Sequence, residues 1–365
     1  MAVNKNKILI VLPKLNCGGT ERTAAELANY IAENGGEVSI LLMFREEIFF
    51  TLHKNVKLIQ PKNIRKKIGR ILYLPYLLFF LRRSIKAENA EMIFSLGYIA
   101  ITLAVSLGLS STVIISGRSS PTRIRFPGNR ILNNLYIFSH RILKKRVNGI
   151  IAQTTFAKEI YSKKYRIPIK VIPNFLREIK PHDHLTRNNQ IVTVGRLTFE
   201  KGQHFLLQAF SKLQAPGWKL VLVGEGPKRS ELEKLAVDLG IGGSVIFKGL
   251  QKDVDYFLSQ SKIFVFTSII EGFPNALIEA MANPLACVSF NCEAGPSDII
   301  QNAENGFLVE VGDIDELVKK IQLLVDDEKQ RSFVTNNALL SRKRYSINKI
   351  AGEYLNFFSQ VAQHK

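Results

Sequence analysis

The chain has 365 residues, of which 46% are hydrophobic and 22% charged, and its formal net charge is +19 at pH 7. This length fits two domains of ordinary size, each able to bury a core. The three cysteines, Cys17, Cys287 and Cys292, exclude a disulfide-stabilised scaffold and favour a reducing cytosol.

The excess positive charge is confined to one half of the chain. Residues 1–180 contain 30 Lys and Arg against 10 Asp and Glu, whereas the remaining residues contain 20 against 21. Nucleic acids and anionic membranes are the two polyanionic partners that such an excess suits. No helix-turn-helix, zinc-finger or RNP motif accompanies the charge, so the sequence favours a membrane surface and no nucleic acid.

The chain opens with a predicted strand, a glycine loop and a helix. Residues 7–13 are an apolar run of strand length, Gly18 and Gly19 follow, and apolar periodicity predicts a helix over 23–32. The loop lacks the Gly-x-Gly-x-x-Gly spacing of dinucleotide-binding folds. Because residues 1–7 are polar and the apolar run is short, we expect no signal peptide.

A basic and apolar segment lies between residues 62 and 86, which hold eight Lys and Arg and no acidic residue. Its centre, residues 71–81, is an apolar run interrupted by Pro75 and is too short to span a bilayer. Two alternatives fit this pattern: an interfacial helix drawn to an anionic leaflet, or a core-facing helix with a basic rim. Both alternatives hold if the helix packs on the core with one side and exposes one apolar edge to the membrane.

A second basic segment, residues 118–146, follows a predicted strand at 113–116. Its first residue, Arg118, stands in the sequence Ser116-Gly-Arg-Ser-Ser-Pro121. Arginine binds phosphate through a planar fork of donors, so Arg118 is a candidate contact for a donor or acceptor phosphate. A surface arginine in a basic loop is the alternative.

Three short motifs could hold a metal ion, but each has a simpler explanation. His182-Asp183-His184 lies in a polar stretch that predicts an interdomain linker at 179–190. Asp253-Val-Asp255 and Asp313-Ile-Asp315 each stand where a helix is expected to begin, so N-capping explains them better. The sequence therefore predicts no metal site.

The second half of the chain begins with a predicted strand over 191–195 that ends in Gly195 and is followed by Arg196 and Lys201. A forked donor and a compact cation at this spacing could clamp a diphosphate. They could also stabilise the charge that develops on a departing nucleoside diphosphate.

Two further apolar runs, residues 219–223 and 245–248, lead into Gly224 and Gly249. Each reads as a short buried strand followed by a glycine turn. The alternation of strand, turn and helix is typical of a Rossmann-like domain.

The most informative segment is Glu271-Gly-Phe-Pro-Asn-Ala-Leu-Ile-Glu279, which follows a predicted strand at 262–268. It predicts a strand-to-helix loop at the carboxyl edge of a parallel sheet, where doubly wound folds bind ligands. The helix start after Pro274 suits an anionic diphosphate. Glu271 could accept hydrogen bonds from sugar hydroxyls, and Glu279 from a ribose. In the alternative interpretation, Glu271 caps the helix and Glu279 lies on its solvated face.

Together these motifs resemble family 4 of the retaining glycosyltransferases over most of residues 190–325. The matching pieces are Gly-Arg-Leu and Glu-Lys-Gly within 195–202, Val-Gly-Glu-Gly-Pro at 223–227, Phe-Lys-Gly at 247–249, the segment 271–282, Gly-Pro-Ser-Asp-Ile-Ile at 295–300 and Asn-Gly-Phe-Leu-Val at 305–309. The resemblance implies the α/β fold called GT-B, in which two Rossmann-like domains face each other across a deep cleft. We therefore expect domains at 1–178 and 191–345, a linker at 179–190, and a C-terminal helix at 346–365 that returns to the first domain.

The resemblance also implies roles for the site residues. Arg196 and Lys201 would bind the donor diphosphate, Glu279 the nucleotide ribose, and Glu271 the transferred sugar. The remaining donor contacts that it implies are Gly18, Gly19, Gly195, Gly249, Gly272, Phe273, Pro274, Asn275, Ala276 and Leu277. Many relatives carry a His where this chain has the Arg118 segment, and a subset resembles the form found here. No cofactor, metal or enzymic nucleophile is implied, because the leaving phosphate helps to deprotonate the acceptor.

The resemblance narrows the substrates less sharply. Residues 283–300 have a loop form common among relatives that use UDP-hexoses or UDP-N-acetylhexosamines, which favours UDP over GDP or ADP. In family terms, the basic first half points to a polyprenyl-diphosphate-linked glycan or a lipopolysaccharide core as acceptor. We expect a cytoplasmic enzyme bound peripherally to the inner face of the cytoplasmic membrane. A sugar-nucleotide epimerase and a basic nucleic-acid-binding protein are the alternatives.

Overall fold

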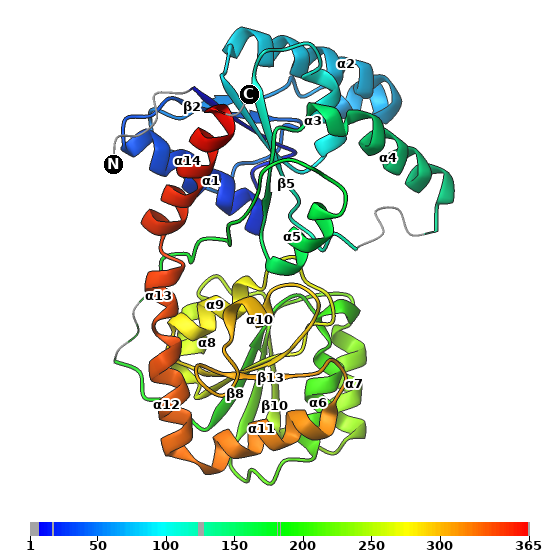
Figure 1. Cartoon of the computed structure of the whole chain (residues 1–365). Helices are drawn as coiled ribbons and strands as arrows, with labels where there is room; N and C mark the ends of the chain where they lie inside the picture. Colours follow the sequence, from blue (N-terminus) through cyan, green and yellow to red (C-terminus); the bar gives the residue numbers. More distant parts are fainter. Residues whose placement is uncertain (1–6, 17, 123–127, 181, 183, 364–365) are drawn as a thin grey trace. The chain divides into compact units, whose positions relative to one another are not determined.

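The structure is a computed structural model that describes residues 7–16, 18–122, 128–180, 182 and 184–363. Cys17, Asp183 and residues 123–127 of the second basic segment lie outside this description. The chain forms two compact units, unit 1 (Met1–Phe175 with Ile347–Lys365) and unit 2 (Leu176–Ser346). Each is built on one parallel sheet with helices on both faces (Figure 1).

The sheet of unit 1 has seven strands in the order β3-β2-β1-β4-β5-β6-β7. Their bounds are β1 (Ile8–Leu12), β2 (Val38–Leu42), β3 (Lys57–Ile59), β4 (Met92–Leu96), β5 (Thr112–Ser116), β6 (Gly149–Ala152) and β7 (Ile169–Val171). The central strand β1 is buried on both faces, as its continuous apolar sequence predicts. Ile8, Ile10 and Leu12 join one apolar cluster, and Leu9 and Val11 join another on the opposite face.

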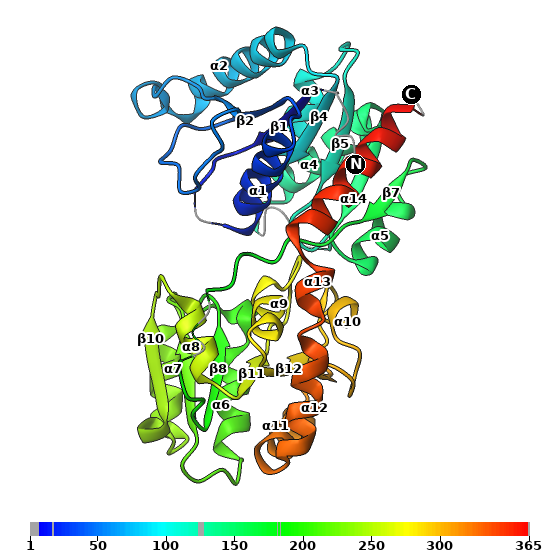
Figure 2. The same ribbon diagram turned by 90° about the vertical axis from the view of Figure 1, so that its left-hand side faces the viewer.

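The helices of unit 1 cover the two faces of this sheet. They are α1 (Gly19–Glu33), α2 (Arg65–Glu88), α3 (Ile99–Val105), α4 (Arg130–Leu143), η1 (Lys144–Arg146), α5 (Thr155–Ser162) and α14 (Ile347–Gln363). Helix α14 lies beside α1, as Figure 2 shows, and both pack on the same face of the sheet. Tyr354 of α14 contacts the rings of Phe94 and Phe175, which fixes the C-terminal helix to unit 1.

Helix α2 shows how the first basic segment, residues 62–86, divides between the core and the surface. It is interrupted at Gly69, where φ is 76°, and then continues through Pro75. Beyond the break it buries Tyr73, Leu77, Leu81 and Ile85 in the core, whereas Ile71, Leu72, Leu74 and Phe79 are exposed. One face of this helix is therefore core-facing. In the part of the chain that the structure describes, none of the helices is long and apolar enough to cross a membrane.

The sheet of unit 2 has six strands in the order β10-β9-β8-β11-β12-β13. Their bounds are β8 (Gln190–Val194), β9 (Lys219–Val223), β10 (Val245–Gly249), β11 (Ile263–Phe266), β12 (Ala286–Phe290) and β13 (Phe307–Val309). The helices are η2 (Phe199–Lys201), α6 (Gln203–Ser211), α7 (Arg229–Asp238), η3 (Gly242–Ser244), α8 (Val254–Gln260), α9 (Asn275–Ala282), α10 (Pro296–Ile299), α11 (Ile314–Asp326), α12 (Glu328–Ala338) and α13 (Ser341–Arg344). Side chains of α6, α7, α11 and α12 pack in the cluster on one face, and those of α8 and α9 pack in the cluster on the other.

The boundary between the units differs from the expected one. The sequence placed a linker at 179–190, but the chain passes from unit 1 to unit 2 at Phe175 and Leu176. The residues that follow are bonded to unit 2, since the Lys180 N–H donates to Asp255 and the Asn188 N–H to the carbonyl of Gln260. This polar stretch is held by hydrogen bonds, which a composition-based prediction of a linker does not detect.

Candidate active site

Two loops from neighbouring strands meet at the carboxyl edge of the unit 2 sheet. One leaves β8 and ends at Lys201, and the other leaves β11 and contains Glu271. The Nζ of Lys201 lies 2.5 Å from the Oε1 of Glu271, and their side chains are 27% and 12% exposed. The structure therefore brings together the two charged residues that the sequence singled out 70 positions apart.

The backbone around Lys201 holds the two loops in register. The Ile269 N–H donates to the carbonyl of Glu200 at 2.8 Å, and the Thr267 hydroxyl donates to the carbonyl of Lys201 at 3.2 Å. Gly202 has φ of 62°, and a Cβ at this position would lie 2.1 Å from the Thr267 carbonyl oxygen. Only glycine allows this close approach, so Gly202 helps to set the position of Lys201.

Arg196 stands at the same edge with a different environment. Its side chain is exposed, and among the described residues its guanidinium has no hydrogen bond or ion pair. Its carbonyl accepts a hydrogen bond from the Gln203 side chain at 2.9 Å, which fixes the backbone there. A guanidinium on an anchored backbone is well placed to bind an anion from solvent.

The loop before α9 combines buried and accessible residues. Phe273 and Leu277 are buried in the apolar cluster beneath, so only their backbone could contact a ligand. Gly272, Asn275 and Ala276 are half-buried. Pro274 is also buried and packs on Gly295, where φ is 107° and a Cβ would lie 2.3 Å from the proline Cδ.

Gly195 and Gly249 lie at the ends of β8 and β10, on the same edge of the sheet. The Gly195 N–H donates to the Val223 carbonyl at 3.0 Å, and the Gly224 N–H donates to the Gly249 carbonyl at 2.9 Å. Gly195 therefore opens the loop that carries Lys201, whereas Gly249 lies two strands away and is bonded to the end of β9.

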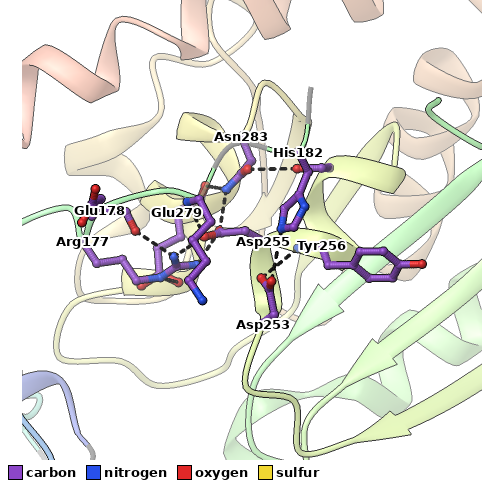
Figure 3. Close-up of polar contacts among 10 residues, drawn as sticks. Arg177, Glu178, His182, Asp253, Asp255, Tyr256, Glu279 and Asn283 are labelled. Carbon is purple, nitrogen blue, oxygen red and sulfur yellow. Dashed lines mark hydrogen bonds and ion pairs between the residues drawn. The ribbon is translucent and has the colours of Figure 1, made fainter. Parts of the chain in front are cut away.

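An ion-pair network joins the half-buried Arg177 to buried carboxylates of α8 and α9 (Figure 3). The two terminal nitrogens of Arg177 bind the two oxygens of Asp255 at 2.5 and 2.6 Å, and its Nε lies 3.1 Å from the Oε2 of Glu279. Asp255 also accepts the Asn283 side chain at 3.0 Å and the Lys180 N–H at 2.9 Å. Glu279, the candidate ribose ligand, is thus fixed by a guanidinium.

The charges of this network stabilise one another. Burial alone would lower the pKa of Arg177, but its hydrogen bonds to Asp255 and the charge of Glu279 outweigh burial and raise the pKa. Burial would raise the pKa of Asp255, but the hydrogen bonds from Arg177 and Lys180 outweigh burial and lower the pKa. Both groups therefore stay ionised at neutral pH.

The first aspartate of each Asp-x-Asp motif caps a helix, as the sequence predicted, whereas Asp255 belongs to the ion-pair network and Asp315 pairs with Lys212. The carboxylate of Asp253 accepts the Tyr256 N–H at 3.3 Å, and that of Asp313 accepts the Glu316 N–H at 3.0 Å. His182 lies 3.2 Å from Asp253. Within the described residues, the structure has no group of three or more His, Cys, Asp or Glu side chains placed to hold a metal ion.

Cys292 lies near the Lys201–Glu271 pair but is not poised as a nucleophile. Burial first, and then the charge of Glu271, raises the pKa of its thiol to about 12. Since the thiolate is the reactive form of cysteine, a protonated thiol at neutral pH takes no part in nucleophilic chemistry.

Three further candidates belong to unit 1. Gly18 precedes α1 as its N-cap residue, and Gly19 is the first residue of that helix. Arg118 follows β5, and its guanidinium donates to the side-chain oxygen of Asn174 at 2.9 Å and to the Tyr354 hydroxyl at 3.4 Å. Arg118 is therefore not a fully solvated arginine, because it is half-buried and bonded both to α14 and to the stretch that follows β7.

Two known protein families match the two halves of the chain. The family Glycosyltransferase Family 4 matches residues 17–177, and the family Glycosyl transferases group 1 matches residues 175–340. The chain belongs to glycosyltransferase family 4. Its two parallel-sheet units are the Rossmann-like domains of the GT-B fold, so the fold predicted from the sequence is confirmed.

Several proteins resemble this glycosyltransferase over nearly their full length. An uncharacterised glycosyltransferase of Haemophilus influenzae is 28% identical, over 93% of this chain and 96% of the relative. A Campylobacter jejuni enzyme, GalNAc-α-(1→4)-GalNAc-α-(1→3)-diNAcBac-PP-undecaprenol α-1,4-N-acetyl-D-galactosaminyltransferase, is 27% identical, over 97% of this chain and 99% of the relative. The structure of Anabaena HepE in complex with UDP and glucose matches with a TM-score of 0.80 at 19% identity, over 97% of this chain and 100% of HepE.

The glycosyltransferase contains one charged residue at the site that sequence reasoning missed. Arg177 was assigned to the end of the first domain, next to the expected linker. No local motif marks it, because its two carboxylate partners lie 78 and more positions further along the chain. The sequence offered no signal for Arg177, which lies in a stretch without helix or strand and becomes informative only when the fold is known.

Proposed function

We propose that this glycosyltransferase moves a hexose or N-acetylhexosamine from a nucleoside diphosphate sugar, with UDP favoured, to a lipid-linked or cell-surface glycan. The observation that carries the proposal is the Lys201–Glu271 pair beside the exposed Arg196 at the carboxyl edge of the unit 2 sheet. The named activity of the Campylobacter jejuni relative and the UDP bound to HepE support the same classes of acceptor and donor.

The donor would replace the direct contact between Lys201 and Glu271. In the structure each charge neutralises the other in a half-buried position. A diphosphate placed between Arg196 and Lys201 would supply Lys201 with a new anionic partner. The Glu271 carboxylate would then be available to accept hydrogen bonds from the sugar hydroxyls.

In the proposed reaction the bond between the sugar C1 and the diphosphate oxygen breaks, and the acceptor hydroxyl oxygen bonds to C1. The hydroxyl proton passes to the leaving phosphate, and configuration is retained when the acceptor enters from the face that the phosphate leaves. Negative charge grows on the nucleoside diphosphate, where Arg196 and Lys201 stabilise it. Arg196 and Lys201 would together fulfil the role that a metal ion would otherwise have, so we propose metal-independent transfer.

Glu279 would bind the nucleotide ribose, and Arg177 would act as the residue that positions it. The Nε of Arg177 holds one carboxylate oxygen of Glu279 at 3.1 Å, while the rest of the guanidinium is bound to Asp255. A carboxylate fixed in this way loses little conformational freedom on binding a ribose hydroxyl. A lipid-linked acceptor would place the reaction on the inner face of the cytoplasmic membrane.

The test is a thermal-unfolding series with UDP, GDP, ADP, NAD and a short DNA duplex, all in EDTA. UDP is expected to stabilise the wild type, by about 2.7 kcal/mol at a hundredfold excess over its dissociation constant. The stabilisation should disappear in Arg196→Ala and persist in Lys212→Ala, whose lysine pairs with Asp315 on the surface. Stabilisation by DNA or NAD alone, or a requirement for metal, would overturn the proposal.

A further inference from the structure

Helix α4 of unit 1 has a continuous apolar stripe that faces solvent. Ile131, Leu135, Phe138 and Ile142 recur at helical spacing, and their side chains are 74%, 58%, 61% and 57% exposed. At 100° per residue these four positions lie within about 60° of one another on the helix. None of the residues of α4, all of which the structure describes, is buried. We refer to these four residues as the α4 stripe.

The opposite side of α4 makes the contacts with unit 1. Asn133, Tyr136, His140 and Leu143 are half-buried on that side, and Leu143 packs against the apolar cluster of the sheet. The helix is therefore attached by its more polar face and presents its apolar face outward, the reverse of an ordinary surface helix. Single exposed apolar residues are common, but a contiguous stripe marks a surface that binds a partner.

The charges around the α4 stripe indicate what kind of partner it fits. Arg130 and Arg141 lie on α4, Lys144 and Lys145 follow it in η1, and all four side chains are exposed. The sequence from 118 to 146 contains no acidic residue. A second copy of the chain seated on the stripe would bring these cations against the same cations. A partner that combines an apolar layer with a negative surface, in contrast, complements both features.

We propose that α4 docks unit 1 on an anionic membrane, with the α4 stripe inserted at the boundary between headgroups and acyl chains. An amphipathic helix with apolar residues on one face and Lys and Arg beside them binds a bilayer interface in this way. Each cation close to an anionic leaflet strengthens binding about fivefold. The docking is a property of unit 1 and does not rest on the donor or acceptor of the proposed reaction.

This proposal changes which element is expected to meet the membrane. The sequence suggested residues 62–86 as the segment that contacts the membrane. In the structure, however, one apolar face of α2 packs in the core, and only its remaining apolar residues are exposed. Helix α3 contacts both α2 and α4, so the three helices form one layer of unit 1 (Figure 1). The exposed residues of α2, such as Ile71 and Phe79, would lie beside the inserted stripe as a secondary contact.

The test is sedimentation of the full chain with vesicles, in the absence of donor and acceptor. Wild type is expected to bind vesicles of phosphatidylglycerol and phosphatidylcholine in equal parts and to be released by salt, with weak binding to phosphatidylcholine alone. Leu135→Ser/Phe138→Ser should reduce binding at least tenfold. The matched control is Val237→Ser/Phe333→Ser, which removes two apolar residues exposed on unit 2 and should bind as wild type does.

A second variant keeps the apolar stripe and reports on insertion. In Phe138→Trp the new indole should shift its emission to shorter wavelength when anionic vesicles are added. The natural Trp218 is 7% exposed within unit 2 and should not respond. Equal vesicle binding by wild type and Leu135→Ser/Phe138→Ser, or no shift in Phe138→Trp, would overturn the proposal. A lipid-free dimer that the double variant dissociates would overturn it in favour of a second copy.

Discussion

Replacing Lys201 with alanine is expected to lower the rate of sugar transfer, measured as the nucleoside diphosphate formed, by about 10²–10³-fold. This is the usual effect of removing one group that stabilises the charge developing on a leaving group. Lys201 is held against Glu271 and backed by the Phe266 ring, whose centroid lies 5.6 Å from its Nζ. These contacts hold the ammonium at the edge of the sheet before the donor binds, and the diphosphate would then replace Glu271 as its partner. The loss should fall mainly on kcat, because the leaving diphosphate carries more charge in the transition state than in the bound donor.

The matched control is Lys212→Ala, which also removes a lysine paired with a carboxylate. Lys212 and Asp315 form their 2.8 Å pair on the exposed surface of unit 2, and the variant should release nucleoside diphosphate at the wild-type rate. Thermal unfolding followed by Trp218, which lies in unit 2, checks that Lys201→Ala remains folded. If the Lys201→Ala variant is folded and retains the wild-type rate, Lys201 does not take part in the reaction.

Replacing Arg177 with alanine is expected to destabilise unit 2 by about 3–5 kcal/mol, the cost of leaving a buried charge without its partner. Asp255 is 1% exposed and would keep only its bonds to Lys180 and Asn283. Glu279 would lose the contact that fixes its carboxylate. The measurement is urea unfolding followed by the fluorescence of Trp218, the only tryptophan in the chain.

Two further variants separate the effects of position and charge. Arg229 also binds two carboxylates, Glu225 and Glu233, but on the exposed surface, and Arg229→Ala should leave the urea midpoint close to wild type. Arg177→Lys keeps the positive charge but loses the forked contact with Asp255, so its midpoint should lie between those of wild type and Arg177→Ala. A wild-type midpoint for Arg177→Ala would contradict the stabilising role of the network.

The parts of the fold that depend on local pattern were predictable. The predicted strands at 219–223 and 262–268 correspond to β9 and β11, and the predicted helix start after Pro274 corresponds to α9, which begins at Asn275. Short apolar runs that end in glycine or proline specify both an element and the point where it stops. Since the loops after parallel strands share one edge of the sheet, the approach of Lys201 and Glu271 was also predictable.

Other contacts between distant residues were not predictable from pattern. Arg177 carries no spacing signal, and only the packing of the chain on unit 2 reveals Asp255 and Glu279 as its partners. The same limit applies to the α4 stripe. Periodicity shows that Ile131, Leu135, Phe138 and Ile142 share a face, but whether that face meets the core or solvent depends on how the helix is attached.

The most direct test of the donor site is a crystal structure of the protein with UDP in the presence of EDTA. We expect diphosphate oxygens within about 3.2 Å of side-chain nitrogens of Arg196 and Lys201, and ribose hydroxyls at the carboxylate of Glu279. We also expect Lys201 to separate from Glu271 when the diphosphate binds. UDP bound elsewhere, with the Lys201–Glu271 pair intact, would contradict the proposed donor site.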